Sequence, residues 1–327
     1  MSPKHVHMPH TGNSDFTVTR LSHFVRVLGL IGLLLALTAC QKSSGSSAKD
    51  SDPTARELVD LRGRVLSYTE QLTPDGPYAP PDEEEHARLA RGVGRLLEGD
   101  AREAERLLAP IGLAVTRLTD TESGRRYDEV AAAGPGESAR WGRLYVNADS
   151  RLRWNAQVPH PVSDRDTEAL GVRLLEDTPG GALVLAGAHR RAGRGDAADV
   201  AHREDSAFHT IVVELQKRDV PGVQLHGFAE STTDRYDAVL STGAAQSAPE
   251  EVSALADRME SDGLRVCRGW SARCPLEGTT NVQGRAAQRQ HTTFVHLELD
   301  PGARGDGRDA DETAAAVAGL LTTWADD

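Results

Sequence analysis

Short apolar runs alternate with helically spaced apolar residues from residue 141 to the end of the chain. The runs have the length of strands and predict strands at 142–147, 153–158, 182–186, 210–215, 222–227, 238–240, 264–267 and 293–299. Helical spacing of apolar residues predicts helices over 167–176, 249–261 and 310–324. This alternation indicates an α/β fold with a mixed central sheet flanked by helices over residues 141–327. In such folds, ligands bind beyond the carboxyl ends of the strands.

The stretch before it, residues 56–140, has a different pattern. Apolar spacing and capping residues predict helices over 56–71, 82–98 and 101–109, and apolar alternation predicts strands at 113–120 and 126–131. Residues of catalytic type do not cluster in this stretch. We therefore expect a small α+β support region that precedes the α/β domain.

The first 40 residues have the pattern of an export signal. Three basic residues lie among residues 1–26, and an apolar run follows at 27–37 that is short for a bilayer span. Residues 37–40 read Leu-Thr-Ala-Cys, which resembles the lipobox of bacterial lipoproteins. The resemblance implies cleavage before Cys40, which becomes the new N-terminus, and alkylation of its thiol by a diacylglycerol that carries acyl chains such as palmitate. A buried helix that happens to end in cysteine is the alternative.

This interpretation predicts two segments ahead of the folded region. Residues 1–39 would be the signal peptide, and the Ser/Gly-rich residues 40–55 a flexible tether. The lipid bilayer would be a partner through acylated Cys40, on the extracytoplasmic face of the cell membrane.

Charge and cysteine content narrow the possible partners. The chain has 37 Lys and Arg against 49 Asp and Glu, a formal net charge of −12, which argues against nucleic acid as a partner. Besides Cys40 there are only Cys267 and Cys274. Two cysteines seven apart in an exported chain predict a disulfide that closes a short loop. Two unpaired thiols remain the alternative, and a zinc knuckle would need a second pair.

Four polar residues stand where the α/β pattern would place a site. His160 follows a predicted strand, Glu168 opens the next helix, His226 ends an apolar run, and Glu298 lies in a late apolar strand. Two histidines and a carboxylate make a three-ligand zinc site with one position open for water. A further glutamate could take the proton from that water. We therefore predict His160, Glu168 and His226 as zinc ligands and Glu298 as the catalytic base.

The order of these residues resembles the zinc carboxypeptidase superfamily, especially small amidohydrolase-type members such as poly-γ-glutamate hydrolases and N-formylglutamate amidohydrolases. In that superfamily a strand-end histidine is followed by a glutamate, an Asp-Leu-Asn-Arg-like segment, a second histidine and a late catalytic glutamate. The matching positions here are His160, Glu168, residues 199–203 (Asp-Val-Ala-His-Arg), His226 and Glu298. The resemblance covers roughly residues 141–305. It implies a zinc cofactor and hydrolysis of an amide bond in a peptide, γ-glutamyl compound or N-acyl amino acid.

Three departures bear on the ligands and the substrate. His160 and Glu168 are eight residues apart, more than in His-x-x-Glu, so Asp164 or Asp166 could be the ligand instead. Ala201-His202 stands where Asn-Arg would bind a substrate carboxylate, and the region is short for a full carboxypeptidase. These departures favour a general amide hydrolase over a strict carboxypeptidase.

Other polar residues are candidates for substrate binding. Arg190 and Arg203 could bind an anionic substrate bidentately, as could Arg191, although a solvated role is open for each. His202 and His209 would line the pocket or form a second metal cluster. Residues 280–285 form a polar loop that could reach the site.

Simpler explanations exist for the predicted site. His160 could shape a turn between two prolines, Glu168 could favour a helix start, and Glu298 could lie on an exposed sheet face. The alternative function is a non-catalytic, ligand-binding lipoprotein on a hydrolase-like fold. The sequence contains no Gly-x-Ser-x-Gly, P-loop or Gly-x-Gly-x-x-Gly motif, so serine hydrolase and nucleotide-binding functions lack their usual support.

Overall fold

The computed structural model of this chain describes residues 55–245 and 247–326. The predicted signal peptide, Cys40 and nearly all of the predicted tether lie outside the described residues. Within the described part, every helix is too short or too polar to span a bilayer.

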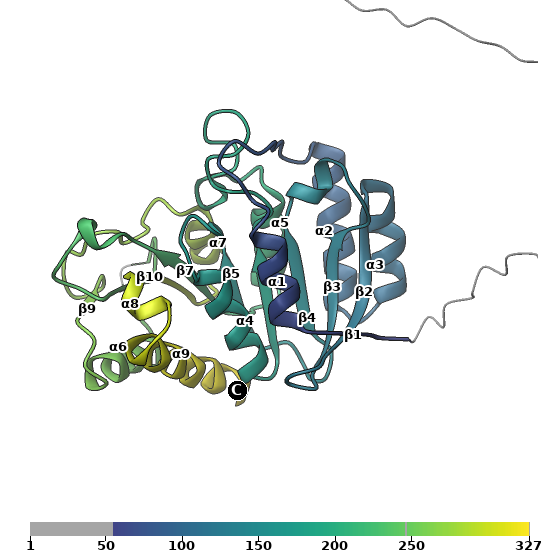
Figure 1. Ribbon diagram of the computed structural model, residues 1–327. Coiled ribbons are helices and arrows are strands. Elements are labelled where there is room, and N and C mark those ends of the chain that lie inside the picture. The colour runs from purple at the N-terminus through teal and green to yellow at the C-terminus, as the bar shows by residue number, and fades with distance from the viewer. Residues whose placement is uncertain (1–54, 246, 327) are drawn as a thin grey trace, which may run out of the picture. The chain divides into compact units, whose positions relative to one another are not determined.

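The described residues form a ten-stranded mixed sheet with strand order β1-β2-β3-β4-β6-β5-β7-β10-β8-β9 (Figure 1). The strands are β1 (Glu57–Val59), β2 (Leu113–Asp120), β3 (Arg126–Ala132), β4 (Arg143–Asn147), β5 (Trp154–Val158), β6 (Gly181–Leu185), β7 (Gly222–Gly227), β8 (Ala238–Ser241), β9 (Val266–Arg268) and β10 (Phe294–Leu299). The neighbours β6, β5, β7 and β10 are parallel, so their carboxyl ends meet at one edge of the sheet. The predicted mixed sheet flanked by helices is confirmed.

Helices cover both faces of this sheet (Figure 1). One face carries α1 (Leu61–Thr69), α4 (Thr167–Asp177), α6 (Glu250–Ser261) and α9 (Arg308–Asp326), whose apolar residues form one core with the strands. The other face carries α2 (Glu83–Leu97), α3 (Ala101–Leu108) and α5 (Ala207–Gln216), which share a second core. On this second face, α7 (Val282–Gln290) packs against α5 and β10, and the short α8 (Pro301–Arg304) follows β10.

The predicted strand at 210–215 is wrong, because these residues belong to helix α5. The β-branched run Ile211-Val212-Val213 favours a strand locally. However, Phe208, Ile211 and Leu215 are buried at helical spacing, and the Ser206 hydroxyl caps the helix by accepting from the amide of His209. Burial of one helical stripe thus outweighs the local strand preference.

Two other predictions need correction. The helix predicted over 56–71 begins only at Leu61, because Glu57–Val59 pair with β2 as strand β1 and Asp60 caps the helix. The polar loop predicted at 280–285 is largely helix α7, whose first turn is capped by the side chain of Asn281. In neither segment is the run of regularly spaced apolar residues long enough to predict where the helix begins.

The N-terminal strands continue the main sheet. The predicted boundary near residue 140 falls between β3 and β4, which pair as antiparallel neighbours. Helix α1 is fixed over these strands by the buried carboxylate of Glu129, which binds Arg64 at 2.6 Å and Arg143 at 3.0 Å. Burial opposes the charge of Glu129, but these two arginines together hold its pKa below the ordinary value.

The predicted disulfide is present between Cys267 and Cys274. It closes a loop that runs from β9 toward α7. Further along this loop, Gly278 lies against the ring of His296, where a Cβ atom would come within 2.5 Å of the imidazole. The loop therefore covers a histidine of strand β10.

Candidate metal centre

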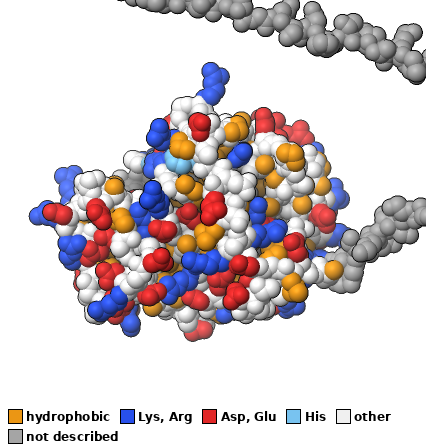
Figure 2. Space-filling model, in the orientation of Figure 1, with side chains coloured by type: hydrophobic (Ala, Val, Ile, Leu, Met, Phe, Trp, Pro, Cys, Tyr) orange, Lys and Arg blue, Asp and Glu red, His pale blue; other side chains and the backbone are white. Residues whose placement is uncertain are grey.

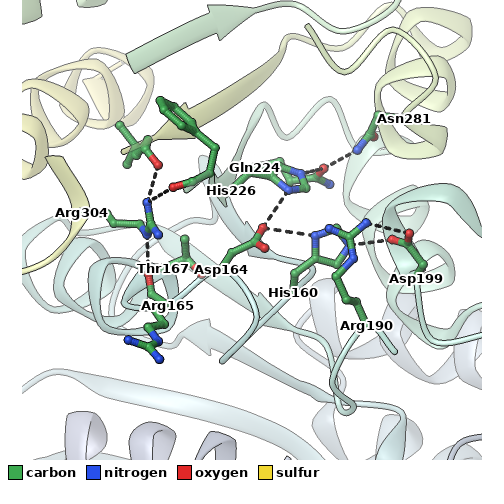
Figure 3. Close-up of polar contacts among 12 residues, drawn as sticks. His160, Asp164, Arg165, Thr167, Arg190, Asp199, Gln224, His226, Asn281 and Arg304 are labelled. Atoms are coloured by element: carbon green, nitrogen blue, oxygen red, sulfur yellow. Dashed lines mark hydrogen bonds and ion pairs between the residues drawn. The ribbon is translucent and has the colours of Figure 1, made fainter. Parts of the chain in front are cut away.

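Two histidines and an aspartate converge at the carboxyl edge of the parallel strands (Figure 3). The Nδ1 atoms of His160 and His226 each lie 3.2 Å from Oδ2 of Asp164, and all three side chains are buried. Zinc binds such ligands at about 2.0–2.2 Å in a tetrahedral arrangement, which would place ligand atoms about 3.3–3.6 Å apart. These two separations are close to that range, and all three potential ligand atoms lie within 4.8 Å of one another, as the ligands of one small ion must.

A strained turn places Asp164 beside His160. The amide of Asp164 donates to the carbonyl of His160 at 2.9 Å, which folds the segment back on itself. Val162 and Asp166 have φ angles of 66° and 68° in this turn. A β-branched residue rarely adopts such an angle, and such strain concentrates at functional sites.

An outer contact fixes the ring of each histidine. Nε2 of His160 lies 2.7 Å from Oδ1 of Asp199, and the other oxygen of Asp199 accepts from Arg190 at 2.8 Å. Nε2 of His226 lies 2.8 Å from Oε1 of Gln224. Acceptors of this kind on the far nitrogen are typical of histidines that ligate metal ions.

The amide of Gln224 determines the tautomer of His226. Gln224 Nε2 donates to Gln157 at 2.9 Å, and Gln224 Oε1 accepts from Asn281. Because this oxygen can only accept, Nε2 of His226 must carry the hydrogen. In the neutral ring the lone pair is therefore on Nδ1, where a metal ion can bind it, and only the doubly protonated ring donates from Nδ1 to Asp164.

These amides form a polar stripe on the second face of the sheet. The stripe runs over β5, β7 and β10 and consists of Asn155, Gln157, Gln224, His226, His296 and Glu298. The residues between them, such as Ala156, Val223 and Leu297, belong to the apolar core on the other face. Glu298 therefore lies on the face opposite Leu297 and Leu299, and it is buried there, so the alternative of an exposed sheet face is wrong.

Strand pairing brings Glu298 to the metal centre. Glu298 lies opposite His226 in the β7–β10 pair, and no described residue forms a hydrogen bond with its carboxylate. Burial, reinforced by the nearby charge of Asp164, raises the pKa of Glu298 to about 8. A carboxylate with this pKa can both take up and release a proton near neutral pH.

His296 was not among the predicted site residues. Its ring lies 4.5 Å from that of His226, and its Nδ1 is buried without a hydrogen-bond partner in the described structure. His226, His296 and Glu298 form a second group whose ligand atoms lie within 4.8 Å of one another. The signal in the sequence was the two-residue spacing from Glu298, which places both side chains on one face.

The pKa values of His160, Asp164 and His226 are shifted by burial and by their mutual contacts. Burial disfavours the ionised form of Asp164, but hydrogen bonds with His160 and His226 outweigh this and lower its pKa. Burial also opposes the charge of His160, yet its contacts with Asp164 and Asp199 raise its pKa. For His226, burial dominates and lowers the pKa. The carboxylate is thus held ionised between two imidazoles.

Glu168 lies at the start of α4 and belongs to neither group of potential ligands. Its carboxylate accepts from the amide of Val162 at 3.3 Å and lies 3.5 Å from the hydroxyl of Thr167. The structure brings His160 and His226 together with Asp164, the alternative that the long His–Glu spacing left open. Asp166 is the residue before α4 and is exposed.

The predicted substrate residues are divided between two places. Arg190 and His202 both contact Asp199, with His202 Nδ1 at 3.3 Å from its carboxylate, so they lie next to His160. Arg203 is paired with Asp205 through two hydrogen bonds of 3.0 and 2.6 Å. His209 lies 3.3 Å from the side-chain amide of Gln283 and supports the buried network.

On the face shown in Figure 2, the described acidic and basic side chains are interspersed. Arg190 is partly exposed, with 35% of its side chain accessible, whereas the candidate ligands are buried. Arg190 is therefore an accessible cation beside the site.

Neither a protein-family model nor a curated protein sequence matches the chain. Among solved structures, a metallo-carboxypeptidase from Burkholderia cenocepacia aligns with 76% of this chain and 70% of its own, at 13% identity and a TM-score of 0.37. A metallo-carboxypeptidase from Pseudomonas aeruginosa, bound to (2-guanidinoethylmercapto)succinic acid, aligns with 75% and 68%, at 13% identity and 0.34. Zinc-free YNDL aligns with 56% and 89%, at 12% identity and 0.37. At these scores, the function must follow from the geometry of the site itself.

Proposed function

We propose that this chain is a zinc-dependent hydrolase of amide bonds, exported and anchored by lipid on Cys40. The observation that supports this proposal is the convergence of His160, Asp164 and His226 beside Glu298, whose carboxylate has no hydrogen-bond partner among the described residues. This is the arrangement that metal-assisted hydrolysis requires: ligands on one side and a proton acceptor on the other.

The donor set fits zinc. Two imidazole nitrogens and one carboxylate oxygen are typical ligands of catalytic zinc and leave a fourth position open. Asp199 and Gln224 orient the two rings from outside. When bound, zinc would polarise the scissile carbonyl group and lower the pKa of a water molecule to about 7.

The chain's own residues would do the remaining work. Glu298 would accept the proton of the attacking water and later give it to the leaving amine. Arg190, held by Asp199 and partly exposed, would bind a carboxylate of the substrate, and His202 would line the same side. Arg203 is already paired with Asp205, so we assign it a lesser role. Peptides, γ-glutamyl compounds and N-acyl amino acids all supply an amide bond near a carboxylate.

The ligand set can be tested with two conservative variants. Asp164→Asn should weaken zinc binding by orders of magnitude, since it removes one of three ligands, whereas Glu168→Gln should bind zinc like the wild type. His226→Ala should behave like Asp164→Asn. Zinc content after dialysis and competition with a chromophoric chelator give the affinities. Zinc loss in Glu168→Gln with retention in Asp164→Asn would restore Glu168 as the ligand.

Catalysis is tested with Glu298→Gln, which keeps the shape of the side chain but removes the base. The variant should bind zinc normally and lose at least about 100-fold in turnover. Peptide, γ-glutamyl and N-acyl amino acid substrates, with and without chelator, provide the assay. A wild-type protein that holds no zinc and gains no activity from added zinc would instead support the ligand-binding lipoprotein.

A further inference from the structure

A buried arginine lies behind the candidate metal centre. Arg304 ends helix α8, and only 8% of the residue is exposed. Its guanidinium donates to three backbone carbonyls: Nε to Arg165 at 2.7 Å, and Nη1 to Phe228 at 3.1 Å and to Leu299 (Figure 3). It forms no ion pair with a described residue, so these carbonyls are its principal partners.

The three carbonyls come from the three segments that carry the site. Arg165 follows Asp164 directly, Phe228 is two residues after His226, and Leu299 follows Glu298 directly. These segments are separate in sequence and meet only at the carboxyl edge of the sheet. One side chain therefore binds the backbone within two residues of two candidate ligands and of the candidate base.

The space for this guanidinium depends on Gly227. A Cβ atom at residue 227 would lie 2.6 Å from Cζ and Nε of Arg304. Gly227 does not have a left-handed backbone conformation, so space alone excludes a side chain there. Lysine could not replace Arg304, because its single ammonium group cannot reproduce the planar fork that reaches these divergent acceptors.

Neighbouring charges accommodate the buried cation. Burial lowers the pKa of Arg304, and the carboxylates of Asp164, Asp166, Asp300 and Glu298 oppose this effect. Asp300 also caps α8 by accepting from the amide of Ala303 at 2.7 Å, which fixes the helix that presents the arginine.

We propose that Arg304 is a positioning residue, which sets the separation of Asp164, His226 and Glu298 by holding the backbone beside each. This inference rests on the proposed metal site. Outer contacts of metal sites typically contribute 10- to 100-fold in metal affinity. We expect a contribution of this size from Arg304, although it touches neither ligand atoms nor substrate.

Two variants vacate the position of the guanidinium in different ways. Arg304→Ala removes the donors, and Gly227→Ala leaves Arg304 in the chain but places a methyl group where its guanidinium lies. Each should weaken zinc binding of the full-length protein by 10- to 100-fold and change the visible spectrum of the cobalt-substituted protein. Guanidinium at low millimolar concentration should restore affinity and spectrum in Arg304→Ala but not in Gly227→Ala, where the space is filled.

Arg125→Ala is the matched control. Arg125 also donates to backbone carbonyls, those of Glu176 at 2.9 Å and Asp177 at 3.4 Å, but these lie at the end of α4 that leads into the amino end of β6, whereas the site lies at the carboxyl ends of the strands. This control variant should leave zinc affinity and cobalt spectrum unchanged. Wild-type affinity and spectrum in both Arg304→Ala and Gly227→Ala would overturn the inference, as would guanidinium that restores the melting temperature but not the spectrum. Absence of zinc binding in the wild type would instead overturn the proposed metal site.

Discussion

Gln224, on strand β7, fixes the orientation and the tautomer of the His226 ring. It is buried, accepts from His226 and Asn281, and donates to Gln157. Because neutral His226 has its lone pair on Nδ1 only in this tautomer, metal binding should depend on a side chain that never contacts the ion.

We predict that Gln224→Met lowers zinc affinity by 10- to 100-fold, since methionine has a similar shape but offers no strong acceptor. It should also cost about 1–3 kcal/mol of unfolding free energy, because Gln157 and Asn281 lose a buried partner. Gln224→Glu keeps the acceptor for His226 and should bind zinc more tightly than Gln224→Met. Chelator competition and imidazole ¹⁵N shifts report affinity and tautomer. Equal affinities in the two variants would refute this role.

Some of these residues could be predicted from the sequence and others could not. His160, His226 and Glu298 stand at the ends of, or within, apolar strands, where a polar side chain is conspicuous. The choice between Asp164 and Glu168 depended on a turn with a positive φ at Val162, which no glycine marks. Arg304 binds backbone carbonyls of residues distant in sequence. Every residue has such a carbonyl, so the amino-acid sequence does not show which ones the arginine binds.

At the scale of elements, the end of helix α4 contacts the turn between β2 and β3. Glu176, which lies at this contact, has a carboxyl group with a shifted pKa. Arg125 of this turn donates to the carbonyl of Glu176 at 2.9 Å. Burial of the Glu176 carboxyl, helped by the charge of Asp120, raises its pKa to about 7, and one of its oxygens has no partner. The folded state therefore binds this proton more tightly than the unfolded state does.

The stability associated with Glu176 should be present below about pH 4.5 and lost as the pH rises through about 7. We predict that Glu176→Gln is more stable than the wild type by about 1 kcal/mol at pH 8, allowing for solvent screening of a half-buried group. The difference should vanish near pH 4. Urea unfolding at both pH values measures it, with exposed Glu122→Gln as the control. A difference independent of pH would contradict the assignment.

The type of most elements followed from periodicity, and the exceptions have a common cause. β2 and β7 have the predicted bounds, and α2 begins at the capping box of Asp82 and Glu85. In α5, the β-branched residues favour a strand locally. The segment is nevertheless a helix, because one side of it packs against β6 and α2. Local preference fails where a tertiary contact determines the conformation.

At the scale of the whole molecule, anchoring by Cys40 stays a prediction. A flexible tether of the proposed length would have an end-to-end distance of about 20 Å, enough to leave substrates access to the folded region. We predict that Cys40→Ser abolishes incorporation of labelled palmitate and releases the protein from membranes, whereas Cys274→Ser keeps the label. Labelled Cys40→Ser protein in the membrane fraction would exclude this anchor.

The polar stripe has a consequence for how the sheet assembles. Side chains alternate along a strand, so a slip of one residue between β5, β7 and β10 would turn Gln157 and Gln224 into the apolar core against α4. The same slip would set Leu225 against Asn281, the residue that caps α7. Each amide buried without a partner would cost about 1–3 kcal/mol. The amides that orient His226 therefore also make a shifted strand register less stable than the native one. Correct pairing of the strands thus places the site residues opposite one another.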